Sequence, residues 1–338
     1  MAVISEIIST IEAGNHLSRQ QMREVFEQIM TGRVEADRMG EFLKALAAKK
    51  ETVEEIAGAA DVMNDKVTRV RCEADCIDTC GTGGDGISTY NVSTTAAIIA
   101  AGAGATVAKH GNRTNTRVSG SAEAIAELGV NLDADVATLE RCLDECGIAF
   151  LYAPNLHPAM KYAGPVRKKL GMRTIFNLLG PLTNPAGAKR QVLGTSKPEL
   201  TETLARVLAA RDAAFAWVVN GHNGLCDLTI TGQTRVTEVR GGQISTFTIH
   251  PNEVGFDAAP LDTLLVDSPQ ASAHAIRAIL EGQDQGPRRQ HALLNAGAAI
   301  VVAGLADDLK TAVNLAARAV DTGVAVQKLN DLVKTSHT

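Results

Sequence analysis

A glycine-rich turn at residues 81–86 offers the backbone and side chains best suited to chemistry in this chain. It reads GTGGDG, with glycine at positions 81, 83, 84 and 86, so its backbone can adopt positive φ angles and a ligand can approach it closely. A segment of strand character at residues 74–79 precedes this glycine turn, and a helix rich in small residues begins near Asn91. Because unpaired N–H groups and the positive end of a helix bind anions, the pattern predicts a phosphate site. Asn91 or a neighbouring serine is the expected N-cap.

Standard phosphate signatures do not account for the glycine turn. Gly81, Gly83 and Gly86 match the spacing G-x-G-x-x-G, but the acidic residue expected about 20 positions later in a dinucleotide site is missing, and residues 106–109 read TVAK. The Gly-Lys-Ser/Thr of a P-loop is also absent. Glycine alone is equally consistent with a plain tight turn. The oxygen-bearing side chains around it favour a metal-bridged phosphate instead: Asp85, Ser88, Asn91, Ser93, Thr94 and Thr95.

A second polar segment, KHGNR at residues 109–113, follows the next expected strand at residues 106–109. In open α/β sheets, ligands bind beyond the carboxyl ends of the strands, so the 109–120 loop and the glycine turn are expected to face one crevice. Lys109 would supply positive charge to a phosphate, and His110 and Asn112 would supply hydrogen bonds. A solvated loop is the alternative, but its position one β-α unit after the glycine turn favours a binding role.

A third, basic segment runs from His157 to Arg173 and contains Lys161, Arg167, Lys168 and Lys169. Each single charge is typical of a solvated helix face. If Arg167 or Arg173 turns inward, its guanidinium suits a carboxylate, which it binds through two parallel hydrogen bonds.

Composition excludes several classes of protein. The chain has 338 residues, 45% of them hydrophobic and 3% aromatic, and a formal net charge of −5. Few aromatics and a negative charge argue against a nucleic-acid-binding surface and against an anionic-membrane surface. No apolar run reaches the length of a membrane span, and the acidic N-terminal start is unlike a signal peptide. Six cysteines without a secretion signal predict reduced thiols and a cytoplasmic protein; a zinc site at the four-residue cysteine spacings is the less favoured alternative.

The elements that must position these residues fall into two groups. Residues 1–72 show only helical periodicity, with Ser18 as an N-cap and Thr52 and Glu55 as a capping box. From residue 73 strands alternate with helices, which predicts a mainly parallel sheet with helical crossovers. Residues 229–250 read as short antiparallel strands joined by glycine turns, and three or four helices follow residue 268. We therefore expect an α/β protein with a small all-helical N-terminal domain, 1–72, joined by helices from about 165–190, and a larger α/β domain, 73–338. The apolar faces left on the helical domain could pack on a second subunit or only on the chain itself.

In this order, the motifs resemble the anthranilate phosphoribosyltransferase family. The matching stretches are GTGGD at 81–85, NVST at 91–94, KHGNR at 109–113, SGSA at 119–122, HPAMK at 157–161, PVR at 165–167 and RTIFNLLGPLTNPA at 173–186.

The resemblance implies a nucleoside-phosphorylase-like architecture, a homodimer through the helical domains, and transfer of a 5-phosphoribosyl group from 5-phosphoribosyl 1-diphosphate (PRPP) to the amine of anthranilate, assisted by Mg²⁺. It implies a donor site of Gly81, Gly84, Asp85, Ser88 or Thr89, Asn91, Val92, Ser93, Thr94, Lys109, His110, Gly111, Asn112, Arg113 and Ser121, to which this chain's own Arg117 is added as a candidate. It also implies an anthranilate site of Gly81, Asn112, His157 and Arg167, and Ser93 and Asp227 as metal ligands. His110 is expected to position the substrate, not to act as a base.

Two departures from the family pattern bear on the metal. Where the family has Gly-Leu-Asp-Glu, whose carboxylates bind magnesium, this chain has Gly224-Leu225-Cys226-Asp227. A thiol is a poor magnesium ligand, so a second metal is doubtful. The family's Ser-Ser after KHGNR is Thr116-Arg117 here, and the Asp after SGSA is Glu123. Arg117 either adds a phosphate contact or blocks the pocket.

Two other functions compete with the transferase. One is a paralogous phosphoribosyltransferase or a nucleoside phosphorylase with another acceptor. The HPAMK and PVR segments favour anthranilate over a nucleobase as the acceptor. The other is a non-enzymatic relative that binds nucleic acid, which the net charge of −5 and the intact GTGGD and KHGNR motifs disfavour.

Overall fold

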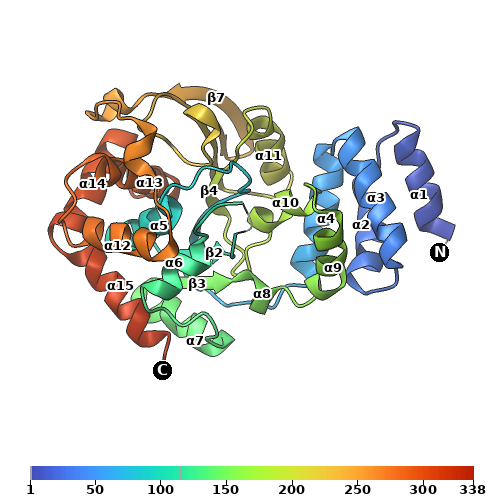
Figure 1. Cartoon of the computed structure of the whole chain (residues 1–338), viewed down its shortest axis with the longest axis horizontal. Helices are drawn as coiled ribbons and strands as arrows, with labels where there is room; N and C mark the ends of the chain where they lie inside the picture. Colours follow the sequence, from blue (N-terminus) through green and yellow to red (C-terminus); the bar gives the residue numbers. More distant parts are fainter. Residues whose placement is uncertain (1, 115) are drawn as a thin grey trace.

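A computed structural model describes residues 2–114 and 116–338. The chain begins with a helical unit of α1 (Ala2–Glu12), α2 (Arg19–Met30), α3 (Ala36–Lys49) and α4 (Val53–Asp65), which lies at one end of the molecule (Figure 1). Both expected N-terminal signals are confirmed. Ser18 and Thr52 each accept a hydrogen bond from the backbone N–H three residues on, and each forms a complete capping box, with Gln21 and Glu55 respectively.

The helical unit takes two further helices from later in the chain, α9 (Met160–Leu170) and α10 (Phe176–Leu179). Val166 and Phe176 belong to the same hydrophobic cluster as α1–α4, and the rings of Phe26 and Phe176 lie 5.5 Å apart. This packing supports the expected joining of residues 165–190 to the helical unit. The domain boundary at residue 72 stays a prediction.

One mixed sheet of seven strands forms the rest of the framework, in the order β3-β2-β1-β4-β5-β6-β7. Strands β1 to β5 pair in parallel. Strand β6 pairs antiparallel with β5, and β7 pairs antiparallel with β6. The strands are β1 (Ile77–Gly81), β2 (Val107–Gly111), β3 (Ile148–Tyr152), β4 (Arg190–Gly194), β5 (Phe215–Gly221), β6 (Thr234–Arg240) and β7 (Gln243–Ile249). Gly241 and Gly242, at φ +56° and +79°, join β6 to β7, as expected for a two-residue hairpin.

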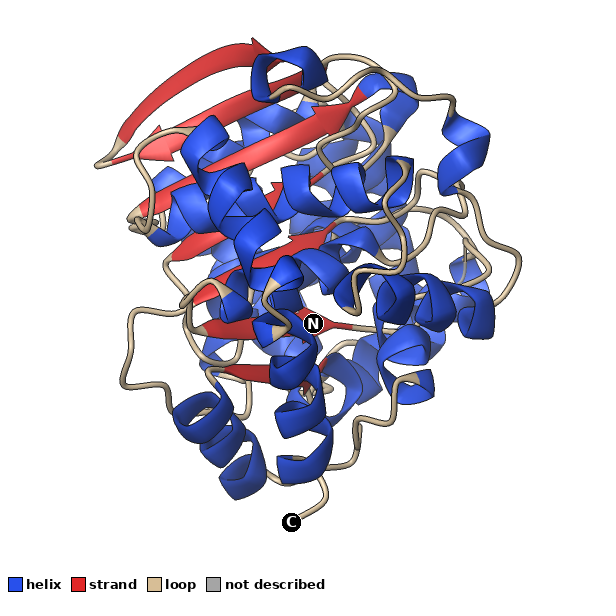
Figure 2. Ribbon diagram, turned by 90° about the vertical axis from the view of Figure 1, so that its left-hand side faces the viewer, coloured by secondary structure: helices blue, strands red, loops and turns tan. Residues whose placement is uncertain are grey.

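Helices cover both faces of the sheet (Figure 2), because its strands present apolar side chains alternately to each side. In β5, Phe215, Trp217 and Val219 belong to one hydrophobic cluster, and Ala216 and Val218 to the other. The remaining helices are α5 (Val92–Gly102), α6 (Ser121–Glu127), α7 (Val136–Arg141), α8 (Ala153–Leu156), α11 (Leu200–Ala209), α12 (Pro269–Leu280), α13 (Pro287–Ala303), α14 (Leu309–Asp321) and α15 (Val324–Thr335).

The strand order reverses its direction between β1 and β4, and ligands of open α/β sheets bind at such a switch point. The last residues of these two strands, Gly81 and Gly194, are register partners. The glycine turn therefore leaves the sheet at its topological switch point.

Two expectations need adjustment. The helix expected at residues 135–146 is α7 followed by a π-helical turn, Cys142–Cys146, which Gly147 ends at φ +71°. The antiparallel strands at residues 229–250 are not short, since β6 and β7 have seven residues each. All six thiols are free. None of the helices in residues 2–114 and 116–338 combines the length and apolar character that a membrane crossing needs.

Candidate active site

The glycine turn has the unusual backbone that its composition predicted. Gly83, Gly84 and Gly86 have φ angles of +63°, +81° and +69°, a region that favours glycine. Gly81 has ordinary φ, and a Cβ there would lie 3.3 Å from the carbonyl oxygen of Gly194. The turn thus directs the chain from β1 toward the N-terminus of α5.

Helix α5 begins at Val92, but its N-cap differs from the expectation. Asn91 occupies the N-cap position without a side-chain capping bond. Its carboxamide donates to the Ser119 carbonyl and accepts from the Ser119 and Ser272 hydroxyls. The side chain of Asn91 forms these tertiary hydrogen bonds in place of a capping bond, and it therefore joins α5 to the 109–120 loop and to α12.

Two threonines near the start of α5 have buried hydroxyls without partners. Thr89 and Thr94 Oγ1 make no hydrogen bond among the described residues, although each residue is only 1% exposed. Val92, in contrast, has its side chain in the core and its N–H bonded to the Tyr90 carbonyl. The two hydroxyls are therefore buried polar groups near the helix N-terminus to which the described residues supply no hydrogen bond.

Lys109 places a buried cation next to the same helix end. Its Nζ donates to the Thr79 carbonyl oxygen and lies 3.4 Å from Ser93 Oγ. Burial lowers the pKa of Lys109, and the charge of Asp78 opposes that shift. A bound phosphate would favour the charged ammonium further, since an opposite charge raises the pKa of an amine. This arrangement of Lys109, α5 and the glycine turn is suited to an anion.

Sequence reasoning missed the groups that position Lys109. The Asp78 carboxylate is fully buried and accepts hydrogen bonds from the His110 N–H at 3.1 Å and from Asn184 Nδ2 at 2.9 Å. Asn184 Nδ2 also donates to the Ala108 carbonyl. Burial raises the pKa of Asp78, and Lys109 opposes this shift. Asn184 lies in the stretch at 173–186 that resembles the family, which was the available signal for it, whereas Asp78 lies outside the matching stretches.

His110 and His157 form a buried ring pair. His110 Nδ1 lies 3.2 Å from the Gly180 carbonyl oxygen and therefore carries the proton of that bond. Its Nε2 then accepts from His157 Nε2, 3.1 Å away. Burial lowers the pKa of His110 to about 3 and that of His157 to about 4, so both rings are neutral at physiological pH. Because the acceptor nitrogen of His110 is occupied, the geometry supports a positioning role for His110.

Replacement of His157 by glutamine is expected to change how stability depends on pH. The folded-state pKa of about 4 lies below the ordinary value of 6.5, so the unfolded chain takes up a proton first as the pH falls. The stabilisation from the neutral ring is complete above pH 6.5 and is lost toward pH 4. Between pH 7.5 and 5.0, we expect wild type to lose about 2 kcal/mol of unfolding free energy relative to His157→Gln. Urea denaturation measures this, with exposed His274→Gln as control; parallel curves for wild type and His157→Gln would contradict it.

The outer part of the 109–120 loop is more exposed. Asn112 is exposed and exchanges backbone hydrogen bonds with the Ser121 hydroxyl, at 3.2 Å in each case. Arg113 Nε donates to the Tyr152 hydroxyl at 3.0 Å. Gly111 is a packing requirement, because a Cβ there would lie 2.4 Å from the Phe150 ring.

Arg167 is a half-buried cation in α9. Its guanidinium stacks on the Phe176 ring, with the two centres 5.2 Å apart, and burial lowers its pKa. Within residues 2–114 and 116–338, no carboxylate pairs with its side chain. A desolvated guanidinium without a counterion is suited to a ligand carboxylate.

Asp85 of the glycine turn is bound by Arg117 of the 109–120 loop. Arg117 Nε lies 2.6 Å from Asp85 Oδ1, and Arg117 Nη2 contacts Oδ2. The Cys226 N–H donates to Oδ2 at 3.3 Å. The two loops and the segment before Asp227 therefore meet at one carboxylate.

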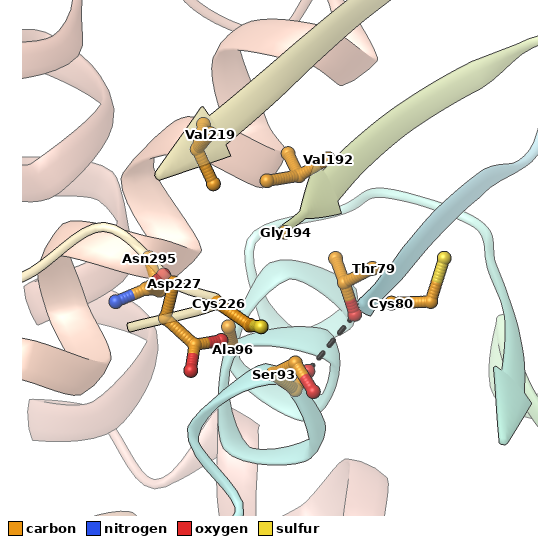
Figure 3. A pocket seen from close by; sticks show the side chains of 10 residues that line it. All are labelled: Thr79, Cys80, Ser93, Ala96, Val192, Gly194, Val219, Cys226, Asp227 and Asn295. Carbon is orange, nitrogen blue, oxygen red and sulfur yellow. Dashed lines mark hydrogen bonds between the residues drawn. The ribbon is translucent and has the colours of Figure 1, made fainter. Parts of the chain in front are cut away.

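Ser93 and Asp227 line a cavity of about 10 Å³, together with Cys226 and Asn295 (Figure 3), which is room for about one water molecule. Asn295 fixes this segment by bonding both the N–H and the carbonyl of Leu228. Burial raises the pKa of Asp227 to about 6, and the charge of Arg117 opposes this shift. A carboxylate and a hydroxyl suit Mg²⁺ that is also held by a phosphate. The donor set fits one such ion; among the described residues no group of three His, Cys, Asp or Glu side chains is placed to bind a metal.

The glycine turn, α5 and Lys109 are thus suited to a phosphate-bearing ligand, and Arg167 of α9 is suited to a carboxylate. Two family models cover the chain: "Glycosyl transferase family, helical bundle domain" at residues 5–67 and "Glycosyl transferase family, a/b domain" at residues 73–326. The chain is 50% identical over 332 residues to the anthranilate phosphoribosyltransferase of Anaeromyxobacter sp. (strain K), covering 98% of both chains. The chain belongs to the anthranilate phosphoribosyltransferase family.

Other members of the anthranilate phosphoribosyltransferase family extend the match. The Chloroflexus aurantiacus protein is 46% identical over 334 residues, 98% of each chain. The crystal structure from Thermus thermophilus is similar with a TM-score of 0.93 at 38% identity, over 98% of this chain and 99% of that one. The Saccharomyces cerevisiae enzyme in complex with PRPP and Mg has a TM-score of 0.91 at 26% identity, over 99% and 98%.

Proposed function

We propose that this chain transfers the 5-phosphoribosyl group of PRPP to the amine of anthranilate and releases diphosphate. The observation that carries the proposal is the buried Lys109, whose Nζ reaches the Thr79 carbonyl of β1, next to the switch point of the sheet. The chain's relatives include anthranilate phosphoribosyltransferases. A relative from S. cerevisiae binds PRPP and Mg, and the same enzyme binds 4-fluoroanthranilate.

In the proposed reaction the anthranilate nitrogen attacks C1 of the ribose as the bond from C1 to the diphosphate oxygen breaks. The nitrogen loses one proton, and diphosphate leaves with the electron pair of the broken bond. Because positive charge develops at the ribose and negative charge on the leaving group, the main requirements are charge stabilisation and alignment. The N-terminus of α5 and the glycine turn supply the charge stabilisation of the leaving diphosphate. A bound Mg²⁺ would neutralise diphosphate oxygens, with Asp227 and Ser93 as its proposed protein ligands.

The proposed roles follow the expected site residues. Glycine-turn and α5 residues bind diphosphate, and Lys109 with the 109–120 loop and Ser121 binds the phosphoribosyl part. Arg167, with Asn112, Gly81 and His157, binds anthranilate. We also propose a homodimer through the helical unit; exposed Tyr162 and Met172, at 38% and 44%, supply apolar surface near it. Light scattering decides the oligomeric state.

The activity is tested by following anthranilate fluorescence on addition of PRPP, with Mg²⁺ varied from zero to millimolar. A signal loss that requires both PRPP and metal supports the proposal. A folded protein that leaves the fluorescence unchanged at every metal concentration contradicts it and directs attention to another acceptor.

Replacement of Arg167 by lysine is expected to raise KM for anthranilate about ten- to a hundredfold. The ammonium keeps the charge but loses the two parallel hydrogen bonds and the stacking on Phe176. KM for PRPP should change little. Steady-state kinetics measure both constants, and Lys168→Ala, on the exposed side of the same helix, is the control. Equal increases in the KM values for anthranilate and for PRPP would contradict the assignment of Arg167 to the anthranilate site.

A further inference from the structure

The pair formed by Arg117 and Asp85 lies inside the proposed donor site and is shielded from water. The side chains are 14% and 1% exposed. Every acceptor position of the carboxylate is used: Oδ1 accepts from Arg117 Nε and from the Ile87 N–H, and Oδ2 accepts from Arg117 Nη2 and the Cys226 N–H. Asp85 therefore has no free oxygen for a metal ion while Arg117 is present.

The second carboxylate of the site, Asp227, follows Cys226, whose N–H donates to the Asp85 carboxylate that Arg117 binds. The sulfur of Cys226 is a poor ligand for Mg²⁺. A protein cation thus occupies the oxygens of Asp85, an acidic group of the donor site at which a divalent ion would otherwise be expected.

Arg117 retains donors for a ligand in this position. A guanidinium has five N–H groups, of which the Asp85 carboxylate uses one on Nε and one on Nη2. In the described part of the chain Nη1 forms no hydrogen bond. Arg117 can therefore contact a diphosphate oxygen without leaving Asp85.

We propose that Arg117 binds the diphosphate directly and supplies, from the protein, the positive charge of a second metal ion, so that the donor binds with a single Mg²⁺. This inference rests on the proposed function for the identity of the donor, but the anion contact itself does not require turnover. Asp85 then orients the guanidinium and joins the glycine turn to the 109–120 loop.

Titration calorimetry with inorganic pyrophosphate in EDTA tests the anion contact without metal or catalysis. We expect wild type to bind pyrophosphate and Arg117→Ser to bind it about ten- to a hundredfold more weakly. Arg117→Gln, which keeps most of the side-chain volume, guards against loss of folding and should show the same defect. The matched control is Arg289→Ser. Arg289 belongs to α13, and its side chain is also 14% exposed and paired with a carboxylate, that of Asp321.

Metal stoichiometry tests the charge replacement. Mn²⁺ binding followed by electron paramagnetic resonance, with saturating pyrophosphate, should give one tightly bound ion per wild-type chain; two would overturn this part of the inference. Unchanged pyrophosphate affinity in both Arg117 variants would overturn the anion contact, even if the enzyme is active. A selective loss of affinity supports it even if wild type fails to consume anthranilate, an outcome that would reject the proposed function alone.

Discussion

Replacement of Lys109 by methionine is expected to lower kcat/KM for PRPP by about 10² to 10³-fold. Methionine preserves much of the length of the buried side chain but removes its charge. The ammonium lies beside Ser93 at the start of α5, bonded to the Thr79 carbonyl. In a site of low dielectric such a charge is worth more to a phosphate than it would be in water. No other lysine among the described residues bonds at this end of α5, so no neighbour replaces the lost charge.

Steady-state kinetics with PRPP as the varied substrate measures this effect. Lys328→Met is the matched control, because Lys328 Nζ also donates to a backbone carbonyl, that of Cys146 at 2.7 Å, but belongs to α15. The variant removes the positive charge that offsets the burial of Asp78. Thermal unfolding therefore checks that Lys109→Met is still folded. A folded Lys109→Met enzyme within threefold of wild type would exclude Lys109 from the donor site.

Replacement of Gly194 by alanine is expected to destabilise the protein and to disturb the metal side of the site. A Cβ on Gly194 would lie 1.6 Å from the carbonyl oxygen of Cys226 and 2.4 Å from its carbonyl carbon. Backbone atoms cannot move aside as a flexible side chain can, so either β4 or the segment holding Cys226 and Asp227 must shift. Overpacking of this kind costs about 3 kcal/mol.

For Gly194→Ala we expect Tm to fall by about 4 °C and kcat to fall at least about tenfold, since the shift displaces Asp227 and the Cys226 N–H that binds Asp85. Scanning fluorimetry and steady-state kinetics measure the two effects. Gly164→Ala is the control, because a Cβ there meets nothing within 4 Å. If Gly194→Ala matched the control in Tm and kcat, the close approach of the two backbones would not be a constraint.

Much of the local structure followed from short-range signals. The capping residues Ser18 and Thr52, the positive-φ glycines of the glycine turn and the hairpin at Gly241 and Gly242 all formed as expected. Each depends on residues within four positions along the chain, where backbone conformation and capping have few competitors. Asn91 is the exception, because the hydroxyls of Ser119 and Ser272 are better partners than its own helix.

The residues of the candidate site could also be predicted in part from the sequence, but their contacts with one another could not. Sequence reasoning named Lys109, Asp85, Arg117 and Asp227 and expected the 109–120 loop and the glycine turn to face one crevice, but it predicted no contact between individual side chains. It did not reveal that Arg117 uses both oxygens of Asp85, nor that Asn184, 106 residues away, holds the Asp78 carboxylate. Both facts depend on pairs of residues from segments far apart in the chain, which no local pattern encodes.

The sequence by itself determined the family, the alternation of helices and strands, and the residue types of an anion site, because periodicity, glycine content and motif order are properties of neighbouring residues. Only the tertiary structure decided where those groups meet. The strand order places Gly81 beside Gly194 at the switch point, and the absence of a side chain at Gly194 lets Cys226 pack over the strand end. Asp85 is thereby brought to Arg117 and the Cys226 N–H, so the charge balance of the site arises from close approach of segments far apart in the chain.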